Sequence, residues 1–166
     1  NCSANGQCNT ATHECQCAAG FGGKACEISL RQLNYTEQVT ASGSFDYQYW
    51  VLPPVTEQML AGNVEIIITA SMESAIYTHH LEARPAILLA PAPSDDVFPT
   101  AHNYTHRLVV DADGKSRTLA LCPSQLVQGN WKLAVYNPMP TYPLDYTLTV
   151  TKVANCLNNC SGHGEC

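Results

Sequence analysis

Cysteine is the residue type in this chain whose number and spacing indicate definite chemistry. The sequence holds nine cysteines in 166 residues, and eight of them lie near the two ends. The N-terminal group follows the spacing Cys2-x5-Cys8-x6-Cys15-x-Cys17-x8-Cys26, and the C-terminal group follows Cys156-x3-Cys160-x5-Cys166. Short cysteine-dense segments cannot bury an adequate hydrophobic core, and disulfide bonds replace it. The spacing therefore predicts disulfide chemistry in an oxidising compartment.

Four asparagines begin the Asn-x-Ser/Thr sequence that accepts N-linked glycans: Asn1, Asn34, Asn103 and Asn159. Chance places one or two such sequences in a chain of this length. Together with the cysteines, they predict an extracellular protein, either secreted or at a cell surface.

The N-terminal cysteine segment contains a Cys-x-Cys pair at Cys15 and Cys17, followed by Gly20-Phe21, Gly23 and Cys26. This pattern resembles the C-terminal half of an EGF-like module, of the kind found in tenascins. The resemblance implies that Cys2 pairs with Cys15 and that Cys17 pairs with Cys26. It also implies that Cys8 pairs with a cysteine upstream of residue 1.

The same resemblance extends to the C-terminal cysteines, which match the first three of such a module. It implies that Cys156 pairs with Cys166 and that Cys160 pairs with a cysteine beyond the last residue. Some modules of this family bind calcium through acidic and amide groups just before the first cysteine. The stretch 151–155 holds no carboxylate, and calcium requires several oxygen ligands, so we expect no metal here.

Residues 1–8 and 159–166 match at their Asn, Cys, Ser, Gly and Cys positions, at an offset of 158. One interpretation is that the chain is one unit of a tandem repeat. The alternative is a mosaic protein with two generic modules of one family. The residues alone leave both open.

Between the two cysteine segments the pattern changes to short β-strands. Phe45, Tyr47, Tyr49 and Val51 alternate with polar residues and Trp50, which is typical of a strand. Further strands are expected at 35–40, 64–69, 85–90, 104–110, 118–122, 131–136 and 146–151, with short helices only within 55–61 and 72–81. We predict a mainly β chain: an antiparallel β-sandwich or jelly roll at 28–153, between partial EGF-like modules at 1–27 and 154–166.

The strand at 129–137, which reads Gly-Asn-Trp-Lys-Leu-Ala-Val-Tyr-Asn, and the strand at 146–150 are similar to the last strands of secreted jelly-roll accessory domains. These include pre-peptidase C-terminal domains and the P domains of proprotein convertases. The resemblance favours the sandwich architecture, whereas function depends on sites rather than on fold.

Cys122 is the cysteine that the two modules leave over. An unassigned cysteine in a secreted protein indicates either a buried, inert thiol or a covalent link to another subunit. We therefore expect Cys122 to be unpaired or intermolecular.

Histidine and acidic residues could in principle bind a metal. His79-His80 with Glu82 form one group, and His102 with His106 form another. A glycan on Asn103 would crowd the second group, so we interpret these histidines as polar loop residues. Asp111-Ala112-Asp113-Gly114 lacks the rest of a calcium loop and predicts a hairpin turn, and Asp95-Asp96 is expected to be a solvated loop.

The sequence contains no catalytic or phosphate-binding motif with supporting context, so we expect no enzyme and no cofactor. Aromatic rings at Tyr47, Tyr49, Trp50 or Trp131 could stack on sugars, but the core needs most of these rings. Eight basic against fourteen acidic residues, without a basic cluster, make nucleic acid a poor partner. The apolar run 86–90 is ended at once by Pro91 and Pro93, so no membrane span is expected.

These observations favour a structural, non-catalytic extracellular glycoprotein segment that self-associates, as a repeat unit of a fibre, matrix or surface appendage such as a mastigoneme. Only 13% of residues are charged, which suits an assembled or glycan-coated surface. The alternative is an ectodomain segment of an adhesion or receptor protein that binds a protein or glycan ligand.

Overall fold

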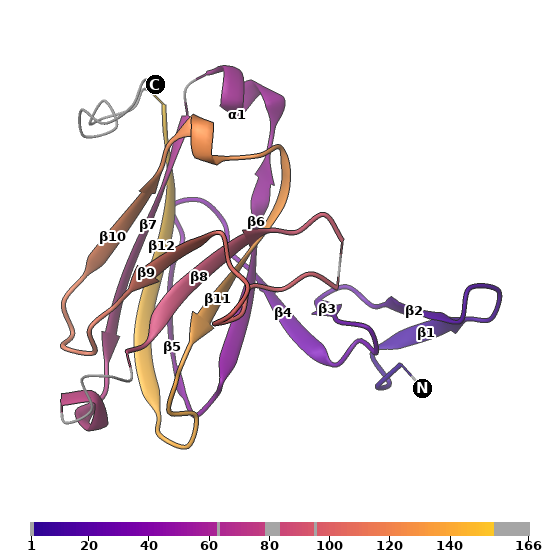
Figure 1. Cartoon of the computed structure of the whole chain (residues 1–166), viewed down its shortest axis with the longest axis horizontal. Helices are drawn as coiled ribbons and strands as arrows, with labels where there is room; N and C mark the ends of the chain where they lie inside the picture. The colour runs from indigo at the N-terminus through magenta and orange to yellow at the C-terminus, as the bar shows by residue number, and fades with distance from the viewer. Residues whose placement is uncertain (1, 63, 79–83, 95, 155–166) are drawn as a thin grey trace.

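The computed structural model describes residues 2–62, 64–78, 84–94 and 96–154. Two β-sheets face one another and form a sandwich, and a small two-stranded sheet projects from its side (Figure 1). The chain is therefore mainly β, and the predicted β-sandwich is confirmed.

One layer of the sandwich is a four-stranded sheet in which every neighbouring pair is antiparallel. Its order is β10 (Arg117–Leu121), β7 (Val64–Glu73), β12 (Leu144–Ala154) and β5 (Gln38–Gly43). The ladder between β12 and β7 is continuous from Asp145↔Glu73 to Ala154↔Val64. The two long central strands thus give this layer a regular register.

The other layer is a six-stranded sheet with one parallel pair, β4 and β6. Its order is β3 (Phe21–Gly22), β4 (Ile28–Gln32), β6 (Tyr47–Val55), β11 (Gly129–Tyr136), β8 (Ala86–Pro91) and β9 (His106–Val109). The register of β11 on β6 shifts between Gly129 and Trp131, where an irregularity interrupts the ladder.

The core lies between the two layers and is built from the alternate residues of each strand, since successive side chains of a strand point to opposite faces. In β7 the inward set is Ile66, Ile68, Ala70 and Met72, and in β12 it is Leu144, Tyr146, Leu148 and Val150. The facing sheet contributes Trp50, Leu52, Ile87, Leu89, Trp131, Leu133 and Val135. Each of these side chains is at most 5% exposed, so the sandwich has a substantial core of its own.

Helical structure among the described residues is short and lies at the ends of the sandwich. Helix α1 (Glu57–Ala61) begins at Thr56, whose hydroxyl accepts a hydrogen bond from the Met59 N–H at 3.3 Å. Two 3-10 turns, η1 (Ala75–Thr78) and η2 (Pro123–Gln125), close other connections. No helix in the described part of the chain is long and apolar enough to cross a membrane.

The disulfide segment, residues 2–26, contains the hairpin of β1 (Gly6–Asn9) and β2 (Glu14–Cys17), paired from Gly6↔Cys17 to Asn9↔Glu14. In Figure 1 this hairpin projects from the sandwich on the N-terminal side. The chain then enters the sandwich directly, because β3, the last strand of the segment, pairs with β4 and forms an edge of the six-stranded sheet.

The observed strands differ from the sequence prediction in three places. The stretch 28–32 forms β4, which the sequence analysis did not identify. The strand expected at 35–40 lies later, as β5. The predicted hairpin at Asp111–Gly114 is wrong, because β9 and β10 are edge strands of different sheets. The chain there crosses between the layers, and the Gly114 N–H donates to the Met72 carbonyl at 2.8 Å.

Candidate functional site

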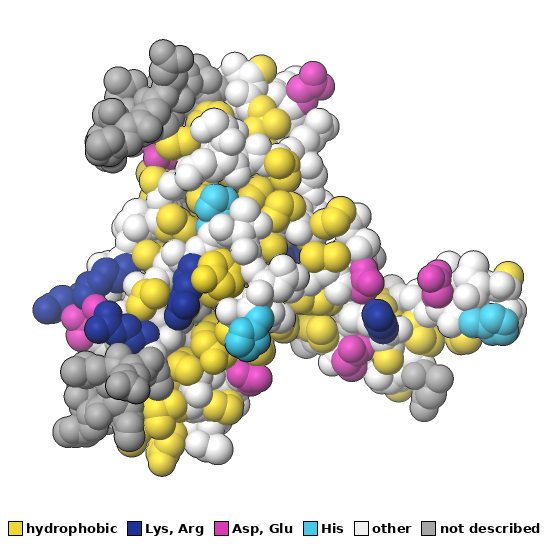
Figure 2. Space-filling view, viewed as in Figure 1, with side chains coloured by type: hydrophobic (Ala, Val, Ile, Leu, Met, Phe, Trp, Pro, Cys, Tyr) yellow, Lys and Arg dark blue, Asp and Glu magenta, His cyan; other side chains and the backbone are white. Residues whose placement is uncertain are grey.

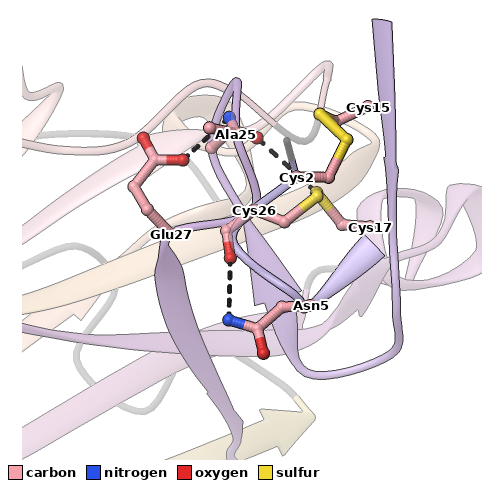
Figure 3. Close-up of a disulfide and its surroundings, with 8 residues drawn as sticks. Cys2, Asn5, Cys15, Cys17, Ala25, Cys26 and Glu27 are labelled. Carbon is pink, nitrogen blue, oxygen red and sulfur yellow. Dashed lines mark hydrogen bonds between the residues drawn. A yellow bond between two sulfur atoms is a disulfide. The ribbon is translucent and has the colours of Figure 1, made fainter. Parts of the chain in front are cut away.

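Two disulfides hold the projecting segment together. Cys2 is joined to Cys15 with a Cα–Cα distance of 5.6 Å, and Cys17 is joined to Cys26 with a Cα–Cα distance of 5.3 Å. Both distances lie within the range of relaxed disulfides, and the pairs are those that the sequence resemblance implies. In Figure 3 the two bridges lie close to one another, and the side chain of Cys26 is fully buried.

Gly6 makes this close packing feasible. A Cβ atom at Gly6 would lie 2.6 Å from the Cys26 sulfur and 2.5 Å from the Gln16 carbonyl oxygen. Both distances are shorter than van der Waals contact, so the hairpin can approach the Cys17–Cys26 bridge only because residue 6 lacks a side chain.

The junction between this segment and the sandwich is fixed by hydrogen bonds as well as by the chain. The Asn5 side-chain amide donates to the Cys26 carbonyl at 3.2 Å, and the Ala25 N–H donates to the Glu27 carboxylate at 2.8 Å (Figure 3). The Leu30 N–H donates back to the Gly20 carbonyl at 2.8 Å. The disulfide segment is thus continued by the six-stranded sheet, without a flexible linker between them.

Cys8 differs from its neighbours because its thiol is free and exposed. It lies on β1 directly opposite Cys15 of β2. The expectation that Cys8 pairs with a cysteine upstream of residue 1 stays a prediction.

Cys122 lies just after β10, is half-buried and forms a disulfide. Its partner is none of the other described cysteines, since Cys2, Cys15, Cys17 and Cys26 pair with one another and Cys8 is free. The structure therefore differs from the expectation of an unpaired or intermolecular Cys122. The EGF-like resemblance accounts for all the other cysteines and leaves no partner for Cys122.

Several predicted residues lie outside the described residues. These are Asn1, His79, His80, Glu82, Asp95, Cys156, Asn159, Cys160 and Cys166.

Both described sequons are accessible. Asn34 precedes β5 and is exposed, and its side-chain amide donates to the Glu37 carboxylate at 3.0 Å. Asn103 is also exposed, in a loop where its backbone forms a bridge with Thr100. Both asparagines lie where a glycan can be attached and still project into solvent.

A groove of about 710 Å³ lies beside the disulfide segment. Its ionisable lining residues are His13, Glu14, Lys24 and Asp96. The Ser94 hydroxyl donates to Asp96, and this bond is the main cause of a lowered pKa of the Asp96 carboxyl. The groove therefore lies between the disulfide segment and the loop after β8, and both basic and acidic side chains line it.

The two histidines of the 102–106 stretch do not form a common site. His102 is exposed, whereas the His106 ring stacks on Trp131 with a centroid distance of 5.9 Å. Among the described residues, no group of three or more His, Cys, Asp or Glu side chains is arranged to hold a metal ion.

Tyrosines form a row on the outer face of the six-stranded sheet. Tyr136 stacks on Tyr47 with centroids 5.0 Å apart, and Tyr47 stacks on Tyr49 at 5.7 Å. Phe98 closes the row with an edge contact to Tyr49 at 4.9 Å. Burial, followed by nearby Tyr47 and Asp46, raises the pKa of Tyr49 to about 12. Because the rings stack on one another, few ring faces are left for stacking on a sugar.

The two indoles are unsuited to sugar binding for another reason. Trp50 and Trp131 are 5% and 1% exposed, and both contribute to the core. The Trp50 indole N–H donates to the Tyr146 hydroxyl at 3.2 Å, and that of Trp131 donates to the Val127 carbonyl at 3.0 Å. These rings are structural.

Charged residues gather around the connection from β9 to β10. Arg117 contacts Asp111 at 3.1 Å and Asp113 at 3.3 Å, and Arg84 contacts Asp111 at 3.3 Å. In Figure 2, basic and acidic side chains crowd the side of the molecule where Figure 1 draws this connection. Asp111 and Asp113, which the sequence analysis weighed as part of a calcium loop, are neutralised by these cations.

Lys132 and Asn137 are buried polar residues that the sequence patterns did not predict. Lys132 is 3% exposed, donates to the Val97 carbonyl at 2.9 Å, and lies 3.9 Å over the Phe98 ring. Asn137 is fully buried and accepts a hydrogen bond from the Tyr77 hydroxyl. Lys132 is the second residue of the largely apolar strand 131–136, and Asn137 directly follows it. These positions were the available signal, because a buried polar residue there must find internal partners.

Comparisons with known proteins give no family. No family model matches the chain, and no curated protein matches it.

Solved structures of similar shape are distant. The pre-peptidase C-terminal domain of a collagenase from Bacillus anthracis superposes with a TM-score of 0.48 at 13% identity, covering 75% of this chain and 96% of that one. A crystal structure solved with a xylogluco-oligosaccharide gives a TM-score of 0.31 at 12% identity, covering 71% and 31% of the two chains. A Cowpea Mosaic Virus empty particle gives 0.27 at 7% identity, covering 58% and 56%.

Proposed function

We propose that this chain is a structural, non-catalytic segment of an extracellular glycoprotein and serves as a repeat unit of a fibre, matrix or surface appendage. In this proposal the disulfide segment is part of an EGF-like module that alternates with the β-sandwich. The cysteines at 156–166 begin the next module, and the copies associate with one another.

The observation that supports this proposal most strongly is the junction through β3 and β4. Phe21 pairs with Ser29 across β3 and β4, and Leu30 pairs with Tyr49 across β4 and β6. A pulling force on the disulfide segment therefore reaches the middle of the six-stranded sheet through hydrogen bonds as well as through the chain. A receptor that only displays a binding site has no need of such a stiff connection, whereas a load-bearing spacer has.

The surface composition supports an extracellular assembly. Only 13% of the residues are charged, and Asn34 and Asn103 are exposed acceptors for glycans. Glycans would keep a sparsely charged surface soluble wherever copies do not cover it.

The alternative proposal is an adhesion or receptor ectodomain that binds a protein or glycan. The groove beside the disulfide segment, with His13, Glu14, Lys24 and Asp96, is the observation in its favour. Its mixed charge and position at the junction would suit a polar ligand.

A non-reduced peptide map of the native, deglycosylated protein, combined with electron microscopy of the same preparation, tests the proposal. The fibre proposal predicts that the Cys160 peptide is bonded to a peptide that ends like Thr12-His13-Glu14-Cys15-Gln16-Cys17, and that the particles are rods of repeating units. Cys160 bonded to an unrelated sequence, in compact monomeric particles, would contradict it and favour the ectodomain.

A further inference from the structure

The four edges of the two sheets differ in how well they are protected against pairing with another strand. An open edge presents unpaired backbone groups, and natural proteins protect such edges with short strands, charges or prolines. Edge strand β3 has two residues, β9 has four including Arg107, and β10 begins with Arg117 in its ion pairs. Strand β5 has six residues and neither charge nor proline. It is the longest and least protected edge in the described part of the molecule.

The backbone direction along β5 follows from its partner β12. The Thr36 N–H donates to the Val150 carbonyl at 2.7 Å, so the backbone of Val150 faces β5. Backbone groups of successive residues point to opposite sides of a strand. Leu148 and Tyr146 therefore also face β5, where they lie opposite Val39 and Ala41.

The backbone groups of Val39 and Ala41 thus bond to β12. The backbone groups of the alternate residues of β5 point away from β12. Gln38, Thr40 and Ser42 each present one N–H and one C=O to the open side of the sheet, where no described strand lies. Their side chains are exposed, whereas Val39 and Ala41 pack against the core. The open edge is therefore regular, uncharged and free of side chains that would block a second strand.

We propose that β5 pairs antiparallel with β5 of a second copy of this chain, with Thr40 opposite its own counterpart. This interface rests on the proposed function, because it provides the lateral contact of the assembly. In this register Gln38 lies opposite Ser42, and Val39 lies opposite Ala41. All outward backbone groups find partners, and the four-stranded sheets of the two copies join into one continuous sheet.

A second copy of the chain meets the requirements of this edge. A twofold axis at Thr40 brings outward-facing residues of both copies opposite one another, because Gln38 then meets Ser42 and Thr40 meets itself. Each chain has a net charge of −6, and an uncharged edge lets two acidic copies meet without opposing charges in contact. Asn34 lies in the loop before β5, outside the pairing residues.

Charge substitutions at Thr40 test this register in the full chain. Thr40→Lys or Thr40→Glu places two like charges directly opposite one another in the dimer, which destabilises the pairing. We expect each variant to lower the association constant in sedimentation equilibrium at least about tenfold, an order-of-magnitude estimate. An equimolar mixture of the two variants is expected to form a heterodimer of wild-type strength.

Thr118 provides the matched control, since it is exposed and lies on the opposite edge strand β10. Thr118→Lys and Thr118→Glu change the net charge in the same way and are expected to leave association unchanged. Thr40→Pro, which removes an outward N–H without removing a bond to β12, should abolish the dimer while the circular dichroism spectrum stays native.

The outcomes separate the two proposals. If the Thr40→Lys, Thr40→Glu and Thr40→Pro variants self-associate as strongly as the wild-type chain, the β5 interface is overturned and the proposed function stands. Weaker association that the mixture does not restore overturns the Thr40-centred register. A wild-type chain that remains monomeric at all concentrations, while the native protein still forms rods, overturns the β5 interface alone. Monomeric native protein overturns both.

Discussion

At the scale of single residues, Asn137 is a buried side chain at which three hydrogen bonds meet. It is fully buried, its carbonyl oxygen accepts from the Tyr77 hydroxyl and from the Met139 N–H, and its amide donates to the Tyr142 carbonyl. The cluster ties η1 to the connection between β11 and β12. Removing the Asn137 amide leaves the buried Tyr77 hydroxyl without its acceptor, and an unsatisfied buried group costs more than the bond itself contributes.

Asn137→Ala is therefore expected to lower the free energy of unfolding by about 2–3 kcal/mol. Urea denaturation followed by tryptophan fluorescence measures this, with the disulfides intact. Asn130→Ala changes an exposed asparagine within β11, the strand that Asn137 follows. It is the control and should cost less than about 0.5 kcal/mol. Equal losses for the two variants would contradict a special role of Asn137.

The raised pKa of Tyr49 predicts that the free energy of unfolding decreases at alkaline pH. Its pKa is raised from the ordinary value of 10.0 to about 12, mainly by burial. The unfolded chain therefore loses the Tyr49 proton at lower pH than the folded protein does, and unfolding becomes easier between about pH 10 and 12. Below this window the contribution of Tyr49 is fully present.

Tyr49→Phe should reduce the slope of unfolding free energy against pH in this window, because the variant has no proton to lose there. Denaturant titrations at intervals from pH 9 to pH 12 measure the slope. A slope identical to that of the wild type would show that the Tyr49 hydroxyl is ionised at the same pH in both states.

Sequence patterns predicted residue roles well where local spacing is decisive, and poorly where distant segments meet. The pairs Cys2–Cys15 and Cys17–Cys26 follow a short, regular spacing. The disulfide of Cys122 follows no such local spacing, so no short pattern indicated it. Likewise, the stacked row of Tyr136, Tyr47 and Tyr49 depends on the register of β11 against β6.

At the scale of elements, the disulfide segment and the sandwich have different sources of stability. The segment depends on its two bridges, because only Cys2, Gly22 and Cys26 are buried within it. The sandwich has its own core of apolar strands. Elements stabilised in different ways should also open separately.

The double variant Cys17→Ser, Cys26→Ser should loosen the segment and leave the sandwich folded. A disulfide that closes a loop of this size contributes about 2–3 kcal/mol. Hydrogen exchange is expected to become faster in β1, β2, β3 and at the Leu30 amide, whereas β7 and β12 stay protected. Loss of protection in β7 would show that the sandwich requires the segment in order to fold.

Most strands could be predicted from period-two alternation, since half-buried antiparallel strands produce it. Strand β4 (Ile28–Gln32) could not, because Arg31 and Gln32 are both exposed and interrupt the alternation. The hairpin prediction at 111–114 failed for a related reason. Turn residues indicate that the chain reverses, but whether the next strand joins the same sheet depends on the core, where Leu119 and Leu121 pack against the facing layer.

At the scale of the whole molecule, charge distribution separates two modes of association. Each copy has a net charge of −6, so copies repel one another at low ionic strength. The β5 edge has no charge, whereas the cluster of Arg84, Asp111, Asp113 and Arg117 would bind a partner through ion pairs. Salt screens repulsion and ion pairing alike, so its effect depends on which surface forms the contact.

We therefore expect the association constant of the β5 dimer to rise as salt increases from about 0.01 M to 0.15 M, over which the screening length falls from about 30 Å to 8 Å. It should also rise as the pH falls from 7 toward the isoelectric point near 5.4, because each copy then loses negative charge. Sedimentation equilibrium at each condition measures this, with Thr40→Pro as the control that should remain monomeric throughout. An association constant that falls with added salt would instead assign the contact to the ion-pair cluster, because only an interface held by opposite charges is weakened by screening.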